Sequence, residues 1–187
     1  MPEQYVGTKF QTTFARREPP HDDRLEELSV WCHQLGRLGV VGDTVGNLSC
    51  RTAAGFLINR TAGDLRTISA GEFVEVLRAD IAGRELTVAG AFEPSSESLM
   101  HAAIYAARPE IGAVFHGHSQ RLLEQAAILQ LPVTEREQPY GTPELAAEIV
   151  KILGWQKILV MRHHGFVTVG RTMAEAGRWV EHILARL

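Results

Sequence analysis

Residues 112–118 read Gly-Ala-Val-Phe-His-Gly-His, a short apolar run that closes on two histidines separated by one glycine. Such a run predicts a β-strand. Side chains at positions i and i+2 of a strand point to the same face, so the imidazoles of His116 and His118 are able to reach one point. A metal ion requires this, since each nitrogen must lie ~2.0–2.1 Å from it. Taken alone, the pattern also fits two histidines at a strand end.

A second stretch ends in the same way. Residues 157–165 read Lys-Ile-Leu-Val-Met-Arg-His-His-Gly, so another apolar strand leads into His163-His164 and a glycine corner. Imidazole is a preferred zinc ligand, and a third nitrogen from this stretch would complete a site with His116 and His118. The remaining histidines lie in less informative contexts, and we expect them to be structural or exposed. They are His21, His33, His101 and His182.

The hydrophobic periodicity around these stretches predicts an α/β domain. Helices are expected at 22–40, 96–107, 119–129, 142–153 and 173–187. Strands are expected at 47–51, 55–59, 72–78, 84–88, 112–115, 157–162 and 166–169, with hairpins joining the first two and the next two. The sum is a central, mostly antiparallel sheet covered by helices. Residues 22–187 form one domain in this interpretation. Residues 1–21 lack periodicity and end near Pro19-Pro20, which favours an arm outside the core.

Composition narrows the class of protein. The chain has 187 residues, 45% of them hydrophobic and 22% charged, with a formal net charge of -3, all typical of a folded globular domain. No stretch approaches the ~20 apolar residues of a membrane span, and the N-terminus resembles no signal peptide, so we expect a cytoplasmic protein. Basic and acidic residues alternate, which does not favour nucleic acid binding. Cys32 and Cys50 are expected to be reduced.

Two polar stretches carry further signals. In Pro94-Ser95-Ser96-Glu97, a serine before a helix usually caps it and a glutamate complements the helix dipole. The same groups also suit a phosphate cradle made of two hydroxyls and free helix amides, with Glu97 as a base. In Gly46-Asn47, the glycine allows close approach of a ligand and the asparagine both donates and accepts hydrogen bonds.

These motifs occur together in the order of a known family. The sequence carries Gly46-Asn47-Leu48-Ser49, then Pro94-Ser95-Ser96-Glu97, His116-Gly117-His118, Gly141-Thr142-Pro143-Glu144 and His163-His164-Gly165. In this combination the chain closely resembles the class II aldolase/adducin family, whose enzymes include L-fuculose-phosphate aldolase. The resemblance extends from about Glu26 to the last residue.

The resemblance implies a three-layer αβα fold, commonly a homotetramer, and an enzyme that cleaves a small phosphorylated sugar or hydroxy-keto compound through a metal-stabilised enediolate. It implies Zn²⁺, or another divalent transition metal, on His116, His118 and His164. It gives Glu97 the role of acid and base. It assigns the substrate phosphate to Gly46, Asn47, Thr61, Ser95 and Ser96.

The chain departs from these aldolases in ways that bear on the substrate. The aldolases carry a tyrosine in a longer stretch after the second zinc histidine and another in a C-terminal tail, whereas here the stretch offers Tyr140 and the sequence ends at Leu187. Epimerisation, dehydration or decarboxylation by the same zinc chemistry therefore stay open. A non-catalytic adducin-like scaffold is expected to have lost the ligands that this chain retains. Arg60, in place of a proline in the family's turn, is either an anion contact or a solvated cation.

Overall fold

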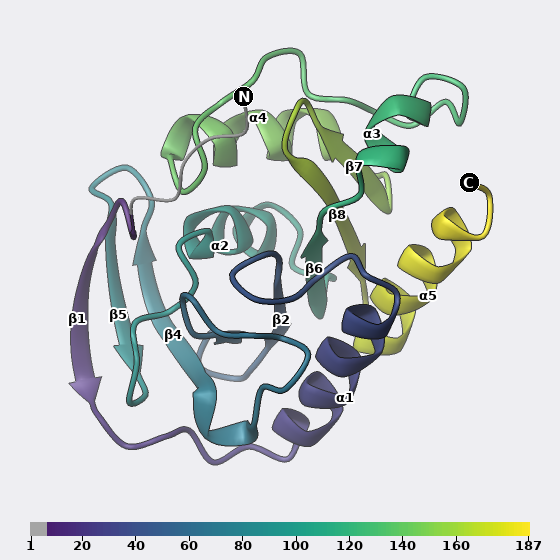
Figure 1. The fold of residues 1–187 in the computed structure, drawn as a ribbon. Helices are drawn as coiled ribbons and strands as arrows, with labels where there is room; N and C mark the ends of the chain where they lie inside the picture. Colours follow the sequence, from purple (N-terminus) through teal and green to yellow (C-terminus); the bar gives the residue numbers. More distant parts are fainter. Residues whose placement is uncertain (1–6) are drawn as a thin grey trace.

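The computed structural model describes residues 7–187 and is built around one eight-stranded sheet (Figure 1). The strands are β1 (Gln11–Arg16), β2 (Asn47–Arg51), β3 (Phe56–Asn59), β4 (Phe73–Asp80), β5 (Glu85–Ala89), β6 (Ala113–Gly117), β7 (Ile158–Met161) and β8 (Gly165–Gly170). They lie in the order β1-β5-β4-β3-β2-β6-β8-β7. Every neighbouring pair is antiparallel except β1 and β5, which are parallel. The prediction of a mostly antiparallel sheet is confirmed.

Helices cover both faces of the sheet and make three layers (Figure 1). They are α1 (Arg24–Arg37), α2 (Ser98–Ala107), α3 (Gln120–Gln125), α4 (Pro143–Leu153) and α5 (Met173–Leu184), with a short 3-10 turn at Ala70–Glu72. Strand alternation explains the layering, because successive side chains point to opposite faces. Phe115 of β6 packs in the cluster that includes α1 and α5, whereas its neighbour Val114 packs with α2 and α4. The αβα fold class is confirmed.

The predicted helices differ from the observed ones at their ends, and two of the differences bear on the site. The helix expected from residue 96 begins at Ser98, because Glu97 occupies the N-cap position. The helix expected over 119–129 extends only from Gln120 to Gln125, and its chain then continues in turns. Apolar periodicity is weak at helix ends, where capping groups rather than core contacts decide the boundary.

The predicted arm over residues 1–21 needs correction. Residues 11–16 form β1, which pairs with β5 from Gln11 opposite Glu85 onward, and the preceding Phe10 is buried. Residues 1–6 lie outside the described part of the chain. The open edge of β5 offers a row of backbone hydrogen-bonding groups, and pairing with β1 satisfies them. Local periodicity carries no information about such a distant partner.

The remaining expectations concern the cysteines and the membrane. Cys32 and Cys50 are free and buried, which confirms the expectation of reduced thiols. Within residues 7–187, no helix has both the length and the apolar character that crossing a bilayer requires.

Candidate active site

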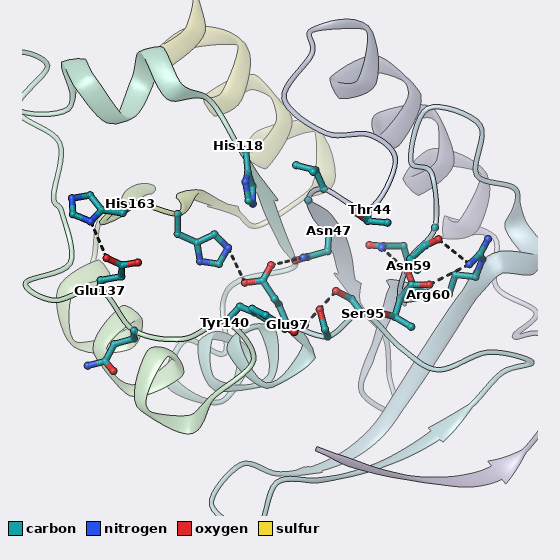
Figure 2. A pocket seen from close by; sticks show the side chains of 18 residues that line it. Thr44, Asn47, Asn59, Arg60, Ser95, Glu97, His118, Glu137, Tyr140 and His163 are labelled. Atoms are coloured by element: carbon teal, nitrogen blue, oxygen red, sulfur yellow. Dashed lines mark hydrogen bonds and ion pairs between the residues drawn. The ribbon is translucent and has the colours of Figure 1, made fainter. Parts of the chain in front are cut away.

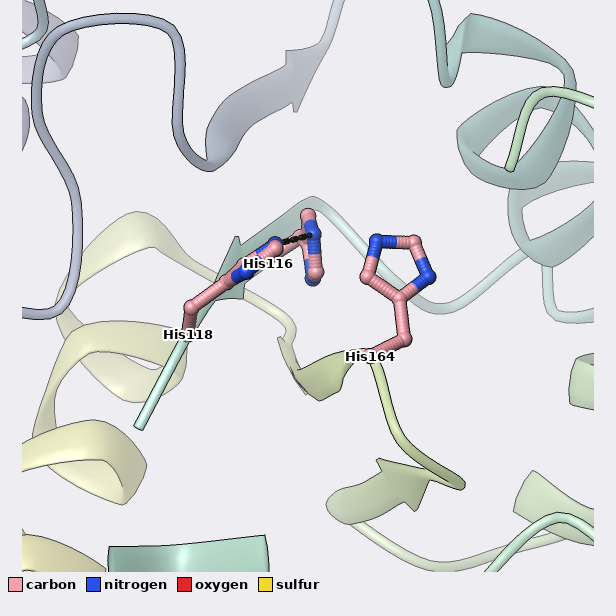
Figure 3. A group of neighbouring side chains, drawn as sticks. All are labelled: His116, His118 and His164. Carbon is pink, nitrogen blue, oxygen red and sulfur yellow. Dashed lines mark hydrogen bonds between the residues drawn. The ribbon is translucent and has the colours of Figure 1, made fainter. Parts of the chain in front are cut away.

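Three histidines from two strand ends converge on one point (Figure 3). His116 lies near the end of β6, His118 follows that strand, and His164 lies in the turn between β7 and β8. One ligand nitrogen from each ring lies within 4.8 Å of the others. The Nε2 atoms of His116 and His118 are 3.0 Å apart. Because β6 pairs with β8, the strand order brings the two sequence stretches together.

The turn between β7 and β8 selects His164 rather than His163 for this cluster. His163 has a positive φ of 58° and its exposed ring pairs with Glu137 at 2.9 Å, away from the other histidines (Figure 2). Gly165 allows the close approach of the turn, since a Cβ there would lie 2.8 Å from Cε1 of His116. A bulkier residue would push the turn away from β6.

The geometry fits a divalent transition metal. Nδ1 of His116 lies 2.8 Å from the carbonyl oxygen of Phe166, so this nitrogen is protonated and donates, and a metal ion would bind at Nε2. That nitrogen faces Nε2 of His118 at 3.0 Å. Two imidazole nitrogens this close are stabilised by a shared proton or cation. Three converging imidazoles are a ligand set that suits zinc and related metals.

Glu97 lies beside the histidines at the start of α2. Its Oε2 is 3.0 Å from Nε2 of His116, and its Oε1 is 3.4 Å from Nε2 of His164. The side-chain amide of Asn47 donates to Oε2 at 2.8 Å. Oε1 is buried and has no hydrogen-bond partner among the described residues. A buried carboxylate oxygen without a hydrogen-bond partner costs free energy, so this oxygen is a candidate to accept a hydrogen bond or proton from a ligand.

The electrostatics of the site favour a positive charge at this point. Burial alone would raise the pKa of Glu97, but the charges of His116 and His164 and two hydrogen bonds hold it well below the usual value. Burial also acts to lower the pKa of His116, and the Glu97 carboxylate more than offsets this and raises it. Burial, with repulsion from the other two rings, lowers the pKa of His118 to about 3. The Glu97 carboxylate is therefore ionised and lies beside imidazole nitrogens, an arrangement that favours binding of a proton or a metal cation.

A cavity of about 280 Å³ opens beside Glu97 (Figure 2). It is lined by eight of the nine predicted site residues. They are Gly46, Asn47, Thr61, Ser95, Ser96, Glu97, His118 and His164. The ninth, His116, is buried behind them at 1% exposure. Five separate segments of the chain thus meet in one pocket, whose size suits a small ligand.

The expected phosphate cradle differs in its donors. The backbone amides of Ser95 and Thr61 already donate to Asn59 and Glu93, and the amide of Ser98 donates to the carbonyl of Ser95. The free helix amides expected near Ser95 are therefore not available at these positions, because the turn before α2 uses them.

Gly46 brings the chain close to the histidines on the opposite wall. Its φ is +83°, and a Cβ at this position would lie 2.9 Å from the carbonyl oxygen of His116 and 2.6 Å from Val41. Only glycine adopts this conformation in this space without strain. The residue therefore sets the position of Asn47, which follows directly.

The structure also places residues in or beside the pocket whose role the sequence left open or did not indicate. Arg60 lies in the pocket wall, where its Nε pairs with Glu72 at 2.9 Å and its Nη1 donates to the carbonyls of Thr61 and Ala62. Tyr140 lines the same cavity. His101, expected to be structural or exposed, is fully buried and lies 2.5 Å from Oδ1 of Asn47. Its position four residues after Glu97, on a helix that is otherwise apolar, was the available signal.

Comparisons with known proteins agree with this arrangement. The family described as Class II Aldolase and Adducin N-terminal domain matches residues 26–185. A 5-methylthioribulose-1-phosphate/5-deoxyribulose-1-phosphate aldolase of Escherichia coli is 30% identical over 171 residues, which cover 81% of this chain and 78% of that protein. A methylthioribulose-1-phosphate dehydratase of Methylococcus capsulatus is 30% identical over 193 residues, covering 86% of this chain and 91% of its own.

The fold is also similar to that of solved structures. The structure of an L-fuculose 1-phosphate aldolase superposes with a TM-score of 0.76 at 25% identity, and the match covers 89% of this chain and 84% of that one. The family match, which spans most of the sequence, agrees with this fold. This chain belongs to the class II aldolase/adducin family.

Proposed function

We propose that this protein is a zinc-dependent carbon-carbon lyase of the class II aldolase type, acting on a small phosphorylated sugar or hydroxy-keto compound. The observation that carries the proposal is the approach of Glu97 to two of three converging imidazoles, at 3.0 and 3.4 Å, on the wall of a small polar pocket. A non-catalytic scaffold gives no reason for a buried carboxylate oxygen that has no hydrogen-bond partner among the described residues.

The zinc ion, held by three neutral imidazoles, would act as a Lewis acid that stabilises negative charge on the substrate oxygens. Glu97 is the acid and base of this proposal. Asn47 holds its Oε2 by a hydrogen bond at 2.8 Å, and Oε1 is left to accept a proton from substrate and to return it to carbon. The surrounding burial keeps water from competing for this carboxylate.

The phosphate end of the substrate would bind at the pocket wall that includes Ser95, Ser96 and Thr61. These three residues line the pocket and carry hydroxyl groups, and Gly46 lets the backbone before Asn47 pack against His116 and Val41 at the pocket wall. Arg60 adds positive charge to the same wall, although its guanidinium is already partly neutralised by Glu72. These groups would fix the reacting carbon beside Glu97, which converts binding energy into orientation.

Dehydration is a second candidate, favoured by one observation. The dehydratase relative is as similar as the aldolase relative, at 30% identity, and the match covers 91% of its length. A dehydratase also removes a proton next to a ketone, and it then expels water and keeps the carbon skeleton intact. Glu97 would serve both reactions in the same position.

Product analysis separates these functions. Protein purified without a histidine tag and loaded with zinc would be incubated with a panel of ketose phosphates and hydroxy-keto acids, and the products identified by mass. Aldol cleavage yields an aldehyde and a shorter ketone, whereas dehydration yields one product lighter by one water. Proton exchange of dihydroxyacetone phosphate in deuterated water tests the first step alone. A zinc-loaded protein that gives neither exchange nor product across the panel would contradict the proposal.

We further propose a homotetramer, as the family resemblance implies. Several large apolar side chains are exposed in the described chain, including Phe92 at 42% and Trp155 at 84%, and such side chains often become buried on assembly. Light scattering on the purified protein measures the mass directly. A monomer at micromolar concentration would contradict this part of the proposal.

A further inference from the structure

One face of α2 carries polar side chains in a helix that is otherwise apolar. Glu97, His101 and Tyr105 lie four residues apart and therefore share a face. Facing them, β2 carries Asn47 and Ser49, which alternate with core residues and point to the same side of the sheet. All five are buried, with exposed fractions of 5% or less.

The spacing of the helix matches the spacing of the strand. Four helical residues rise about 6 Å. Two strand residues advance about 6.6 Å. Each polar side chain of β2 can therefore bridge two polar side chains of α2. The observed contacts alternate in this way along the interface, from Glu97 to Asn47, His101, Ser49 and finally Tyr105.

The hydrogen bonds have a consistent direction. Nδ2 of Asn47 donates to the Glu97 carboxylate at 2.8 Å, so Oδ1 of Asn47 is the acceptor for Nε2 of His101 at 2.5 Å. His101 then carries its proton on Nε2, and its Nδ1 accepts from the hydroxyl of Ser49 at 2.6 Å. The Tyr105 hydroxyl lies 2.8 Å from Ser49 and is left to donate. Every link has one donor and one acceptor.

This direction requires a neutral His101, and its surroundings provide for one. The ring is fully buried, and burial lowers the pKa of His101 to about 3, although the nearby Glu97 acts in the opposite sense. A charged ring would have two donor nitrogens, so the Ser49 hydroxyl would have to reverse. The ring is not part of the pocket lining and reaches the site only through Asn47.

We propose that His101 is a positioning residue that locks the Asn47 side chain with its amide nitrogen toward Glu97, and so holds the Glu97 carboxylate in place for proton transfer. This inference rests on the function proposed above. With the Asn47 amide reversed, Oδ1 would face the carboxylate and two buried acceptors would repel each other. A ring that donates from Nε2 makes the reversed orientation unfavourable, because it would then face the NH₂ group.

Nuclear magnetic resonance of the full-length protein tests the orientation without requiring activity. With ¹⁵N-labelled histidine, the signal of His101, assigned by its loss in His101→Gln, should show protonated Nε2 and unprotonated Nδ1. The side-chain amide signals of Asn47 should shift in His101→Leu. The opposite tautomer, or a doubly protonated ring at neutral pH, would overturn the inference.

Kinetics test the consequence for catalysis with a matched pair of variants. Ser49→Ala/Tyr105→Phe removes the far end of the chain of hydrogen bonds and keeps His101, so kcat should stay within about threefold of the wild type. The triple variant adds His101→Leu to this double variant, so that no buried hydroxyl of Ser49 or Tyr105 is left without a hydrogen-bond partner. Its kcat should be lower than that of the double variant by on the order of 10- to 100-fold. KM and zinc content should change little. His101→Gln, which keeps a donor near the Nε2 position, should recover most of the activity.

The outcomes separate this inference from the proposed function. If the triple variant matches the double variant in kcat, or if Gln is as harmful as Leu, His101 has only a structural role. If the wild type has no activity on any substrate, the proposed function fails. In that case the tautomer and the Asn47 amide signals still decide whether His101 sets the orientation of Asn47.

Discussion

The histidine cluster and the chain of hydrogen bonds under it are both buried and polar, but they differ in how far their groups are satisfied. In the cluster, Oε1 of Glu97 has no hydrogen-bond partner among the described residues, and two imidazole nitrogens face each other at 3.0 Å. In the chain from Asn47 to Tyr105, each donor meets an acceptor. The first arrangement needs a ligand, whereas the second is complete within the protein.

The degree of burial therefore does not distinguish binding residues from structural residues in this protein. His116 is 1% exposed and His101 is 0% exposed. The difference lies in the partners. Both ring nitrogens of His101 have partners within the chain of hydrogen bonds, whereas Nε2 of His116 faces another imidazole nitrogen and the Glu97 carboxylate, at 3.0 Å each. Buried polar groups whose hydrogen-bonding capacity is not satisfied within the protein indicate a site of ligand binding or catalysis.

The largest expected effect comes from removing a ligand of the cluster. In His118→Ala, bound zinc should fall below about a tenth of an equivalent and activity by on the order of 10³-fold or more, because two imidazoles rarely hold the ion. Metal analysis and turnover measure both. His163→Ala is the matched control, since this neighbour of His164 is exposed and pairs with Glu137. Equal zinc loss in both variants would contradict the assigned ligand set.

Replacement of the carboxylate should separate catalysis from metal binding. Glu97→Gln should lower kcat by about 10²- to 10⁴-fold, the usual contribution of a positioned acid and base, while zinc content stays near that of the wild type. Steady-state kinetics and metal analysis are the measurements. Glu137→Gln, which changes an exposed carboxylate at the pocket rim, is the control. Undiminished kcat in Glu97→Gln would remove Glu97 from the reaction.

The buried neutral ring of His101 should make the free energy of unfolding depend on pH. His101 has a pKa of about 3 in the folded protein against 6.5 as its ordinary value, so between these values the unfolded chain binds a proton that the folded protein does not. Its contribution to stability is therefore present above pH 6.5 and is lost as the pH falls, by up to about 1.4 kcal/mol per pH unit. Urea unfolding at several pH values should give a shallower slope for His101→Gln than for the wild type. Equal slopes would indicate that the folded ring becomes protonated.

The smallest effect is expected at the far end of the chain of hydrogen bonds. Tyr105→Phe removes one donor to Ser49 but keeps the ring that Arg51 covers at 4.7 Å, so unfolding should become easier by about 1 kcal/mol. Thermal or urea unfolding measures this loss. Turnover should stay within about twofold, since Ser49 can still donate to His101. A loss of activity comparable to that of Glu97→Gln would mean that the chain of hydrogen bonds takes part in the reaction.

Much of the fold was accessible from local patterns. The apolar run at residues 112–115 predicted a strand, which the structure has as β6, and the hairpin of β2 with β3 followed from their short separation. The edge strand β1 was missed because its pairing with β5, more than seventy residues away in sequence, leaves no periodic signal in Gln11–Arg16.

The candidate site divides in the same way. Strand spacing singled out the histidine pairs, and the position of Glu97 at a helix start, with the order of the motifs, singled out the carboxylate. The role of His101 could not be recognised from the sequence, since its partners Asn47 and Ser49 are more than fifty residues away on another element.

The sequence by itself determined which residues form strands and helices and which side chains are able to bind a metal, because neighbours along the chain fix backbone conformation and the alternation of faces. The tertiary structure alone decided that β6 lies beside β8, which brings His164 to the histidine pair of β6, and that α2 lies against β2 in matching register. These are choices among distant partners. They are made by the simultaneous burial of two apolar sheet faces and the pairing of buried backbone groups, which no local segment can specify.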